Sequence, residues 1–133
     1  MIRLLLVENQ PQIRDGLRMR LKLEPDMTVV GEPRDSLAAL ALAARLRPDV
    51  ILVDIESVEV DGDGFIGSVS SVSPRSAVVV LSLRDDTLTR RRVLAAGAAA
   101  FVSKHDHADR LLYVIRQAAA EAATPARTLP EGR

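Results

Sequence analysis

Five polar residues lie at the ends of four apolar runs in the sequence, and their types suit one kind of chemistry. Glu8 and Asn9 follow the first run, Asp54 and Ser82 end two later runs, and Lys104 comes just after the last. An aspartate can act as a nucleophile and form an aspartyl phosphate, and carboxylates can hold a Mg²⁺ ion beside the phosphoryl oxygens. A lysine and a hydroxyl can bind the remaining oxygens. The residue types therefore indicate phosphoryl transfer to a carboxylate.

These side chains can meet only if the apolar runs form neighbouring parallel strands. The runs cover residues 2–7, 27–31, 50–53, 77–81 and 99–102. Four are continuously apolar and the first is interrupted only by Arg3, which is typical of strands buried on both faces. Helical patterns between the runs favour an α/β, doubly wound parallel sheet with helices on both faces. In such sheets, ligands bind at the carboxyl ends of the strands.

Proline, glycine and aspartate residues mark the ends of the predicted helices. Aspartate and serine favour helix N-termini, and proline and glycine favour the residues after a helix. The predicted helices run from Pro11 to near Pro25, from Asp35 or Ser36 to near Pro48, from Asp85–Asp86 to Gly97, and through Leu111, Leu112, Ile115 and Ala119.

Composition excludes several classes of protein. The 133 residues suit one domain, and 18 Lys and Arg residues balance 18 Asp and Glu residues. Because bulk binding to nucleic acid or anionic membrane needs a basic excess, neither is expected. Cysteine is absent, which excludes disulfides and thiol chemistry and favours a cytoplasmic location. The longest apolar run, residues 94–102, is too short to span a membrane.

The chain resembles a receiver domain of bacterial two-component response regulators, most closely the LuxR, FixJ and NarL types. The resemblance extends over about residues 2–120. The matching stretches are residues 4–9, 30–32, 47–55, 61–62, 79–82, 96–98 and 101–104.

The resemblance implies a flavodoxin-like fold with strand order 2-1-3-4-5, and a role for each site residue. Asp54 would accept a phosphoryl group from a histidine kinase, and the chain itself would not be an enzyme. Glu8, Asn9, Asp54 and the backbone carbonyl of Glu56 would hold Mg²⁺. Ser82 and Lys104 would bind the phosphoryl group, and Phe101 would change rotamer as Ser82 moves.

The chain departs from the family pattern at three places. The family usually has a second acid where this chain has Asn9, so we expect a weakened metal site that still meets the one or two carboxylates Mg²⁺ commonly needs. Ser57-Val58 replaces the usual Met-Pro, and the loop of residues 59–64 carries an extra Asp-Gly. His105 stands where many relatives place a proline.

Two functions therefore stay open. One is a Mg²⁺-dependent phospho-switch that changes a protein–protein or dimer interface to control transcription. The other is an atypical receiver that binds a partner without phosphorylation, because Asn9 weakens the metal site. Asp54-Ile55-Glu56 also faintly resembles the Asp-x-Asp of haloacid-dehalogenase phosphatases, but there the motif follows the first strand.

Residues 1–123 are expected to form the receiver domain, and residues 124–133 a tail or the start of a linker to an absent output domain. A LuxR-type output would bind DNA, whereas this domain by itself is expected not to. Homodimers through the fourth and fifth helices, or the first and fifth, are typical of the family. Arg90, Arg91 and Arg92 are either a solvated helix face or part of such an interface.

Overall fold

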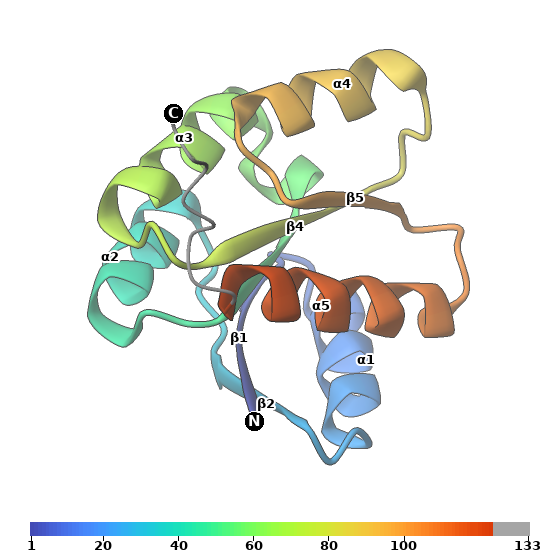
Figure 1. The fold of residues 1–133 in the computed structure, drawn as a ribbon. Coiled ribbons are helices and arrows are strands. Elements are labelled where there is room, and N and C mark those ends of the chain that lie inside the picture. Colours follow the sequence, from blue (N-terminus) through green and yellow to red (C-terminus); the bar gives the residue numbers. More distant parts are fainter. Residues whose placement is uncertain (124–133) are drawn as a thin grey trace, which may run out of the picture.

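Five parallel strands form a single sheet at the centre of the molecule (Figure 1). The computed structural model describes residues 1–123, except for the side chains of residues 59–63. The strand order β2-β1-β3-β4-β5 confirms the predicted doubly wound, flavodoxin-like arrangement. The strands are β1 (Ile2–Val7), β2 (Met27–Gly31), β3 (Val50–Asp54), β4 (Ala77–Ser82) and β5 (Ala100–Ser103).

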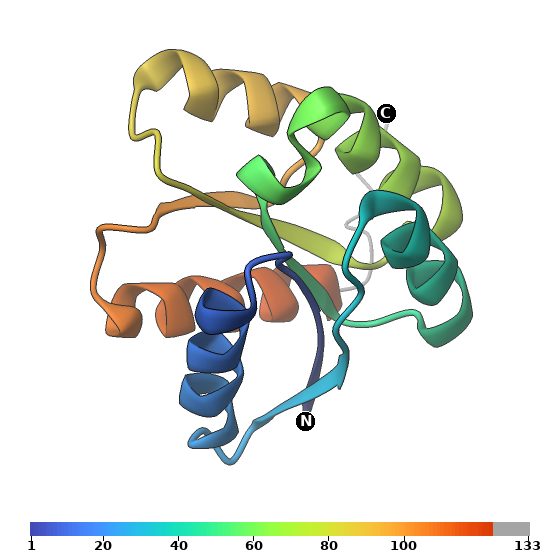
Figure 2. The same ribbon diagram turned by 180° about the vertical axis from the view of Figure 1, so that it is seen from behind.

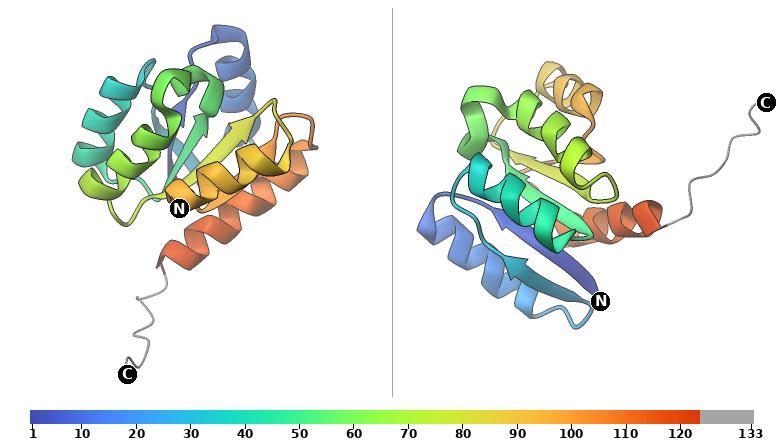
Figure 3. Two further views of the ribbon diagram at one scale, coloured as in Figure 1. Left: turned by 90° about the horizontal axis from the view of Figure 1, so that it is seen from above. Right: turned by 90° about the vertical axis from the view of Figure 1, so that its left-hand side faces the viewer.

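Helices cover both faces of the sheet, as the figures show from opposite sides (Figure 2) and from above (Figure 3). Helices α1 (Pro11–Lys22) and α5 (Ala108–Ala123) pack on one face. The opposite face carries α2 (Ser36–Leu46), α3 (Gly62–Val72) and α4 (Thr87–Ala96). A short 3₁₀ segment, η1 (Ile55–Asp61), follows β3 directly. No helix within residues 1–123 is long and apolar enough to cross a bilayer.

Alternation along the strands divides the core into two layers. Leu5 and Val7 of β1 pack toward α2, α3 and α4, whereas Leu4 and Leu6 pack toward α1 and α5. Strands β1, β3 and β4 are buried on both faces, which explains their continuously apolar sequences. Strand β2 lies at the edge of the sheet and is only partly buried.

Two aspartates begin the helices that follow β2 and β4. The carboxylate of Asp35 accepts a hydrogen bond from the backbone N–H of Ala38 at 2.8 Å. Asp86 accepts one from the N–H of Thr89 at 2.6 Å. Of the two pairs of predicted starting residues, the cap is therefore Asp35 rather than Ser36, and Asp86 rather than Asp85. Gly97 ends α4 with a φ of 119°, a left-handed conformation that favours glycine.

Helix α3 is an element that the sequence did not indicate. Its residues include three glycines and three serines, which are weaker helix formers than alanine or leucine. The helix nevertheless buries Phe65, Ile66 and Val69 against the sheet. Tertiary packing thus outweighs the low local propensity. The expected loop of residues 59–64 instead continues η1 to Asp61 and begins α3 at Gly62. The predicted tail or linker of residues 124–133 lies outside the described residues.

Candidate functional site

The carboxyl ends of β1, β3, β4 and β5 meet at one edge of the sheet. Strand register pairs Val7 with Val53, Asp54 with Leu81 and Ser82 with Ser103. Residues that follow these strands are therefore brought together, as expected for parallel strands. The backbone N–H of Lys104 donates to the carbonyl of Ser82 at 2.8 Å, which ties the end of β5 to that of β4.

Asp54 lies at the centre of this edge and is only 3% exposed. Lys104 Nζ donates to Asp54 Oδ2 at 2.5 Å, and the backbone N–H of Glu56 donates to Oδ1 at 3.0 Å. Burial raises the pKa of Asp54 above its ordinary value, and the neighbouring carboxylate of Glu8 raises it further, while Lys104 opposes both effects. The carboxylate is thus held in place by donors but is costly to charge.

Glu8 is fully buried behind Asp54. Its Oε2 accepts a hydrogen bond from the backbone N–H of Gln10 at 3.1 Å. Its Oε1 has no hydrogen-bond partner and lies 3.9 Å from Lys104 Nζ. A buried carboxylate oxygen without a donor is unfavourable, and a nearby cation would satisfy it.

Ser57 lies between the acidic residues, at the place where the receiver domains that the sequence resembles usually have methionine. Its Oγ is 3.2 Å from Glu8 Oε2, 3.1 Å from Asn9 Oδ1 and 3.3 Å from Asp54 Oδ2. The oxygens of the three predicted side-chain ligands therefore face one small region. Carboxylate and amide oxygens suit Mg²⁺, which keeps several waters and commonly needs one or two carboxylates.

Two carboxylates and an amide make a modest cation site. Among the side chains that the structure describes, no three His, Asp or Glu residues form a group arranged to hold a metal ion. The residues present fit Mg²⁺ only if water and backbone oxygen complete its ligands. The unpartnered oxygen of Glu8 and the convergence on Ser57 support that fit.

The side chain of Glu56 contacts the donors on the other side of Asp54. Ser82 Oγ donates to Glu56 Oε2 at 2.8 Å, and the backbone N–H of Leu83 lies 3.2 Å from Oε1. Lys104 Nζ is 3.6 Å from the same Oε1. The Glu56 carboxylate thus sits among the groups that the sequence suggested as phosphoryl ligands. The sequence indicated a role only for the backbone carbonyl of this residue.

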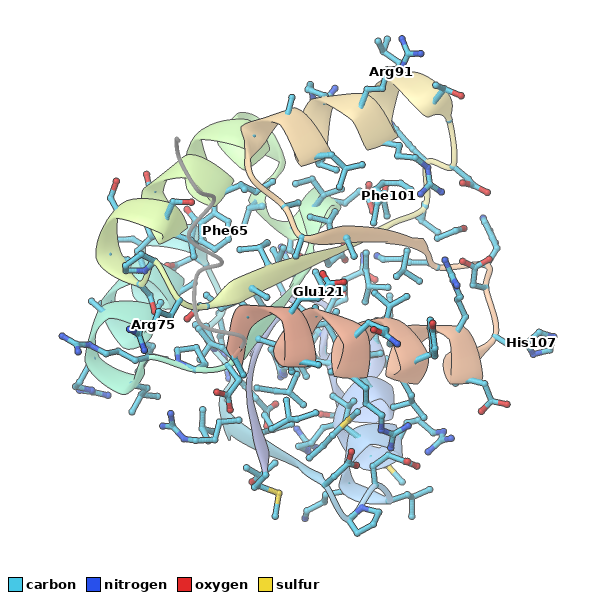
Figure 4. The ribbon with its side chains drawn as sticks, viewed as in Figure 1. Phe65, Arg75, Arg91, Phe101, His107 and Glu121 are labelled. Carbon is cyan, nitrogen blue, oxygen red and sulfur yellow. The ribbon has the colours of Figure 1, made fainter. Side chains whose placement is uncertain are left out.

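Phe101 lies under helix α4 and is 4% exposed (Figure 4). The guanidinium carbon of Arg90 lies 4.8 Å from the centre of its ring, close enough for a cation–π contact. Arg91, the next residue of α4, points away from the fold in Figure 4. All three arginines are exposed, as expected of a solvated helix face, and Arg90 in addition contacts the predicted switch residue.

An apolar groove runs between α1 and α5 and reaches the site. Its volume is about 400 Å³, and Lys104 is among the residues that line it. Ile13 and Leu17 of α1 and Leu111 and Leu112 of α5 contribute to its walls. The sequence indicated the two apolar helix faces but not the space between them.

Comparison with known proteins gives a consistent result. A profile described as "Response regulator receiver domain" matches residues 4–116. The transcriptional regulatory protein YxjL of Bacillus subtilis is 33% identical over 118 residues, which are 89% of this chain and 54% of YxjL. A protein-glutamate methylesterase/protein-glutamine glutaminase of Anaeromyxobacter dehalogenans is 39% identical over 105 residues, 78% of this chain and 31% of that protein. The chain thus spans about half, or less, of these relatives.

Solved structures match over nearly the whole described fold. The signal receiver domain of NarL from Mycobacterium tuberculosis has a TM-score of 0.83 at 28% identity, covering 90% of this chain and 96% of that one. The response regulator domain of Thermotoga maritima CheB has a TM-score of 0.81 at 30% identity, covering 90% and 97%.

Proposed function

The chain belongs to the family of response regulator receiver domains of two-component systems, and from this premise we propose that Asp54 accepts a phosphoryl group from a histidine kinase. The observation that carries the proposal is the position of the Asp54 carboxylate. It lies at the end of β3, bound by Lys104 at 2.5 Å, with the Ser82 hydroxyl at the end of the adjoining strand. These residue types suit phosphoryl transfer, which depends mainly on positioning and charge stabilisation.

In the proposed step, a carboxylate oxygen of Asp54 attacks the phosphorus of a phosphohistidine. An O–P bond forms, the N–P bond breaks, and the released imidazole takes up a proton. The product is an acyl phosphate on Asp54. The attacking group must be ionised, and Lys104 supports that form against the burial that raises the pKa of Asp54.

We propose that Mg²⁺ is bound by Glu8, Asn9, Asp54 and the backbone carbonyl of Glu56. When bound, the ion would neutralise charge on the phosphoryl oxygens. Asn9 supplies an oxygen without the charge of the usual acid, so binding should be weaker than in a site with three carboxylates. Glu8 holds its buried charge beside this pocket, and its unpartnered Oε1 supports the assignment.

An aspartyl phosphate would place a charge of about −1.5 to −2 beside Ser82 and Lys104, in place of the single negative charge of the free Asp54 carboxylate. We propose that both residues bind the new oxygens and that Phe101 changes rotamer as the end of β4 shifts. Phe101 packs below α4 and contacts Arg90, so a change there reaches the surface of α4 and β5. A local electrostatic event can in this way bias a two-state surface.

A kinase has to bring its phosphohistidine to Asp54, and the groove between α1 and α5 offers a docking place. The groove is lined mostly by apolar side chains and includes Lys104, which itself binds Asp54. A helix of the kinase that packs its apolar side chains there would lie beside the site. We assign this groove to the kinase.

The second candidate is a receiver that works without phosphorylation. One observation favours it: the Glu56 carboxylate already contacts Ser82, the Leu83 N–H and Lys104. A domain whose switch residues are satisfied by its own carboxylate could bind a partner constitutively. Asn9 points the same way, because it lowers the charge of the metal site.

Receiver domains are generally not enzymes, and we propose no enzymatic activity for this chain. Methylesterases among the relatives are about three times as long as the region matched. We further propose that residues 1–123 are the receiver and that residues 124–133 lead to an output domain that controls transcription. We also propose that the protein is cytoplasmic and that it forms homodimers through α4 and α5 or through α1 and α5. This domain by itself is not expected to bind DNA.

Mass spectrometry of the intact protein tests the central point. Incubation with Mg²⁺ and acetyl phosphate, or with a phosphorylated kinase, should add about 80 Da, the mass of one phosphoryl group. The Asp54→Asn variant should stay unmodified under the same conditions. An unmodified wild-type protein with every donor would exclude the phospho-switch and favour the constitutive module.

A further inference from the structure

The hydroxyl of Ser57 occupies a position among the candidate cation ligands that the proposed function does not use. Its Oγ lies 3.1–3.3 Å from one oxygen each of Glu8, Asn9 and Asp54. The backbone N–H of Asn9 also donates to it at 3.1 Å. All three side chains proposed to bind Mg²⁺ therefore converge on a single hydroxyl oxygen.

Hydrogen bonding alone does not explain this arrangement. A serine hydroxyl has one proton, so it can donate to only one of the three oxygens at a time. Two oxygen–oxygen contacts are then left without a proton between them. The Gln10 N–H and Lys104 donate to Glu8 Oε2 and Asp54 Oδ2 from elsewhere, but a shared cation would satisfy the facing sides of all the oxygens together.

The spacing matches the shell of a hexacoordinate Mg²⁺ ion. With Mg–O distances of about 2.0–2.1 Å, neighbouring oxygens of an octahedron lie about 2.8–3.0 Å apart. The observed 3.1–3.3 Å separations exceed this by only a few tenths of an ångström. Ser57 Oγ is thus close enough to each of the three oxygens to share one ion with them after a small adjustment.

A second observation concerns the other oxygen of the same Glu8 carboxylate. Glu8 is fully buried, and its Oε1 has no hydrogen-bond partner. Lys104 lies 3.9 Å from that oxygen but is already bonded to Asp54. The pocket therefore holds negative charge that the described side chains do not fully satisfy.

We propose that Ser57 Oγ is a ligand of the bound Mg²⁺, a role that rests on the metal site of the proposed function. A serine hydroxyl is a known type of Mg²⁺ ligand in phosphate-binding sites. Here it supplies an oxygen next to Asn9, where the family's usual acid is missing. The same short segment, η1, then provides two oxygens: this hydroxyl and the carbonyl of Glu56.

A titration of the whole chain with Mg²⁺ tests this role without phosphorylation. The shifts of the backbone NMR signals of Gln10 and Lys104 report the affinity. Ser57→Ala should weaken Mg²⁺ binding about tenfold or more, because removing even a group that only supports a metal ligand costs about 10–100-fold. Ser57→Thr keeps a hydroxyl and should restore most of the affinity. Ser71→Ala, at an exposed position of α3, is the matched control and should bind as wild type does.

Three results would overturn the inference, and they separate it from the proposed function. Equal affinity in Ser57→Ala and wild type would remove Ser57 from the ligands and leave the metal site intact. Tighter binding in Ser57→Ala would show that the hydroxyl blocks the pocket instead of completing it. A wild-type protein that binds no Mg²⁺ would overturn both this inference and the proposed metal dependence. Circular dichroism of each variant would verify that the fold is kept.

Discussion

Replacing Glu56 with alanine should make the phosphoryl site easier to fill. The Glu56 carboxylate contacts Ser82 Oγ at 2.8 Å and the Leu83 N–H at 3.2 Å, so a phosphoryl group has to displace it from both donors. A buried hydrogen bond to a charged group contributes about 1.5–3 kcal/mol net. Because 35% of the Glu56 side chain is exposed, solvent screens these contacts, and we take about 0.7 kcal/mol for each. The sum is about 1.4 kcal/mol, or about tenfold in affinity.

Beryllofluoride, which mimics the phosphoryl group, provides the assay. Titration with Mg²⁺ present, followed by ¹⁹F NMR, should show about tenfold tighter binding to Glu56→Ala. The backbone carbonyl of residue 56 is unchanged by this substitution. Glu56→Gln keeps an acceptor but loses the charge, so its affinity should fall between the two. Glu121→Gln, on an exposed position of α5, serves as the control and should leave binding unchanged.

Binding that is unchanged or weaker in Glu56→Ala would refute this reasoning. Weaker binding would mean that the carboxylate helps to build the site, for example by holding Ser82 in place. Unchanged binding would mean that the contacts with Ser82 and Leu83 exchange with water at no net cost. The order of beryllofluoride affinity among wild type, Glu56→Gln and Glu56→Ala thus shows whether the carboxylate competes with the phosphoryl group or supports its site.

Three further predictions concern the same edge of the sheet. The pKa of Asp54 is raised in the folded state, so its ionised form opposes folding once the pH exceeds its unfolded pKa near 3.8. Asp54→Asn should therefore raise the free energy of unfolding at pH 7 but not near pH 3. Equal effects in urea titrations at both pH values would contradict this. Asn9→Asp should strengthen Mg²⁺ binding about tenfold by restoring a carboxylate, and calorimetry that shows no gain would argue against Asn9 as a ligand. Ile13→Arg should slow phosphotransfer from the kinase about tenfold by placing a charge in the α1–α5 groove, while labelling by acetyl phosphate stays unchanged. A loss of both activities would indicate damage to the site instead.

Strand ends were the part of the site that the sequence could predict. Asp54 and Ser82 end buried runs, and parallel pairing then brings them together whatever the loops do. The same reasoning correctly located Glu8 and Lys104. Continuous apolar runs also predicted a sheet covered on both faces, because each strand residue needs an apolar neighbour.

Side-chain directions in the segment after Asp54 were beyond the sequence. Glu56 and Ser57 are consecutive, yet the Glu56 carboxylate contacts Ser82 on β4, whereas the Ser57 hydroxyl contacts Glu8 after β1. This divergence follows from the 3₁₀ turn of η1, whose tight backbone no residue pattern indicated. Helix α3 was missed for a related reason: its stability comes from packing of Phe65 and Ile66, not from local propensity.

The stacking of Arg90 on Phe101 has a consequence for how firmly the fold holds its resting state. A partly exposed cation–π contact is worth about 0.5–1 kcal/mol. The proposed rotamer change of Phe101 has to break it, so this contact by itself favours the resting rotamer by about two- to fivefold. The contact therefore biases the resting state without fixing it. Loss of Arg90 should raise the population of turned rings before any signal arrives by the same factor, and with it the background output.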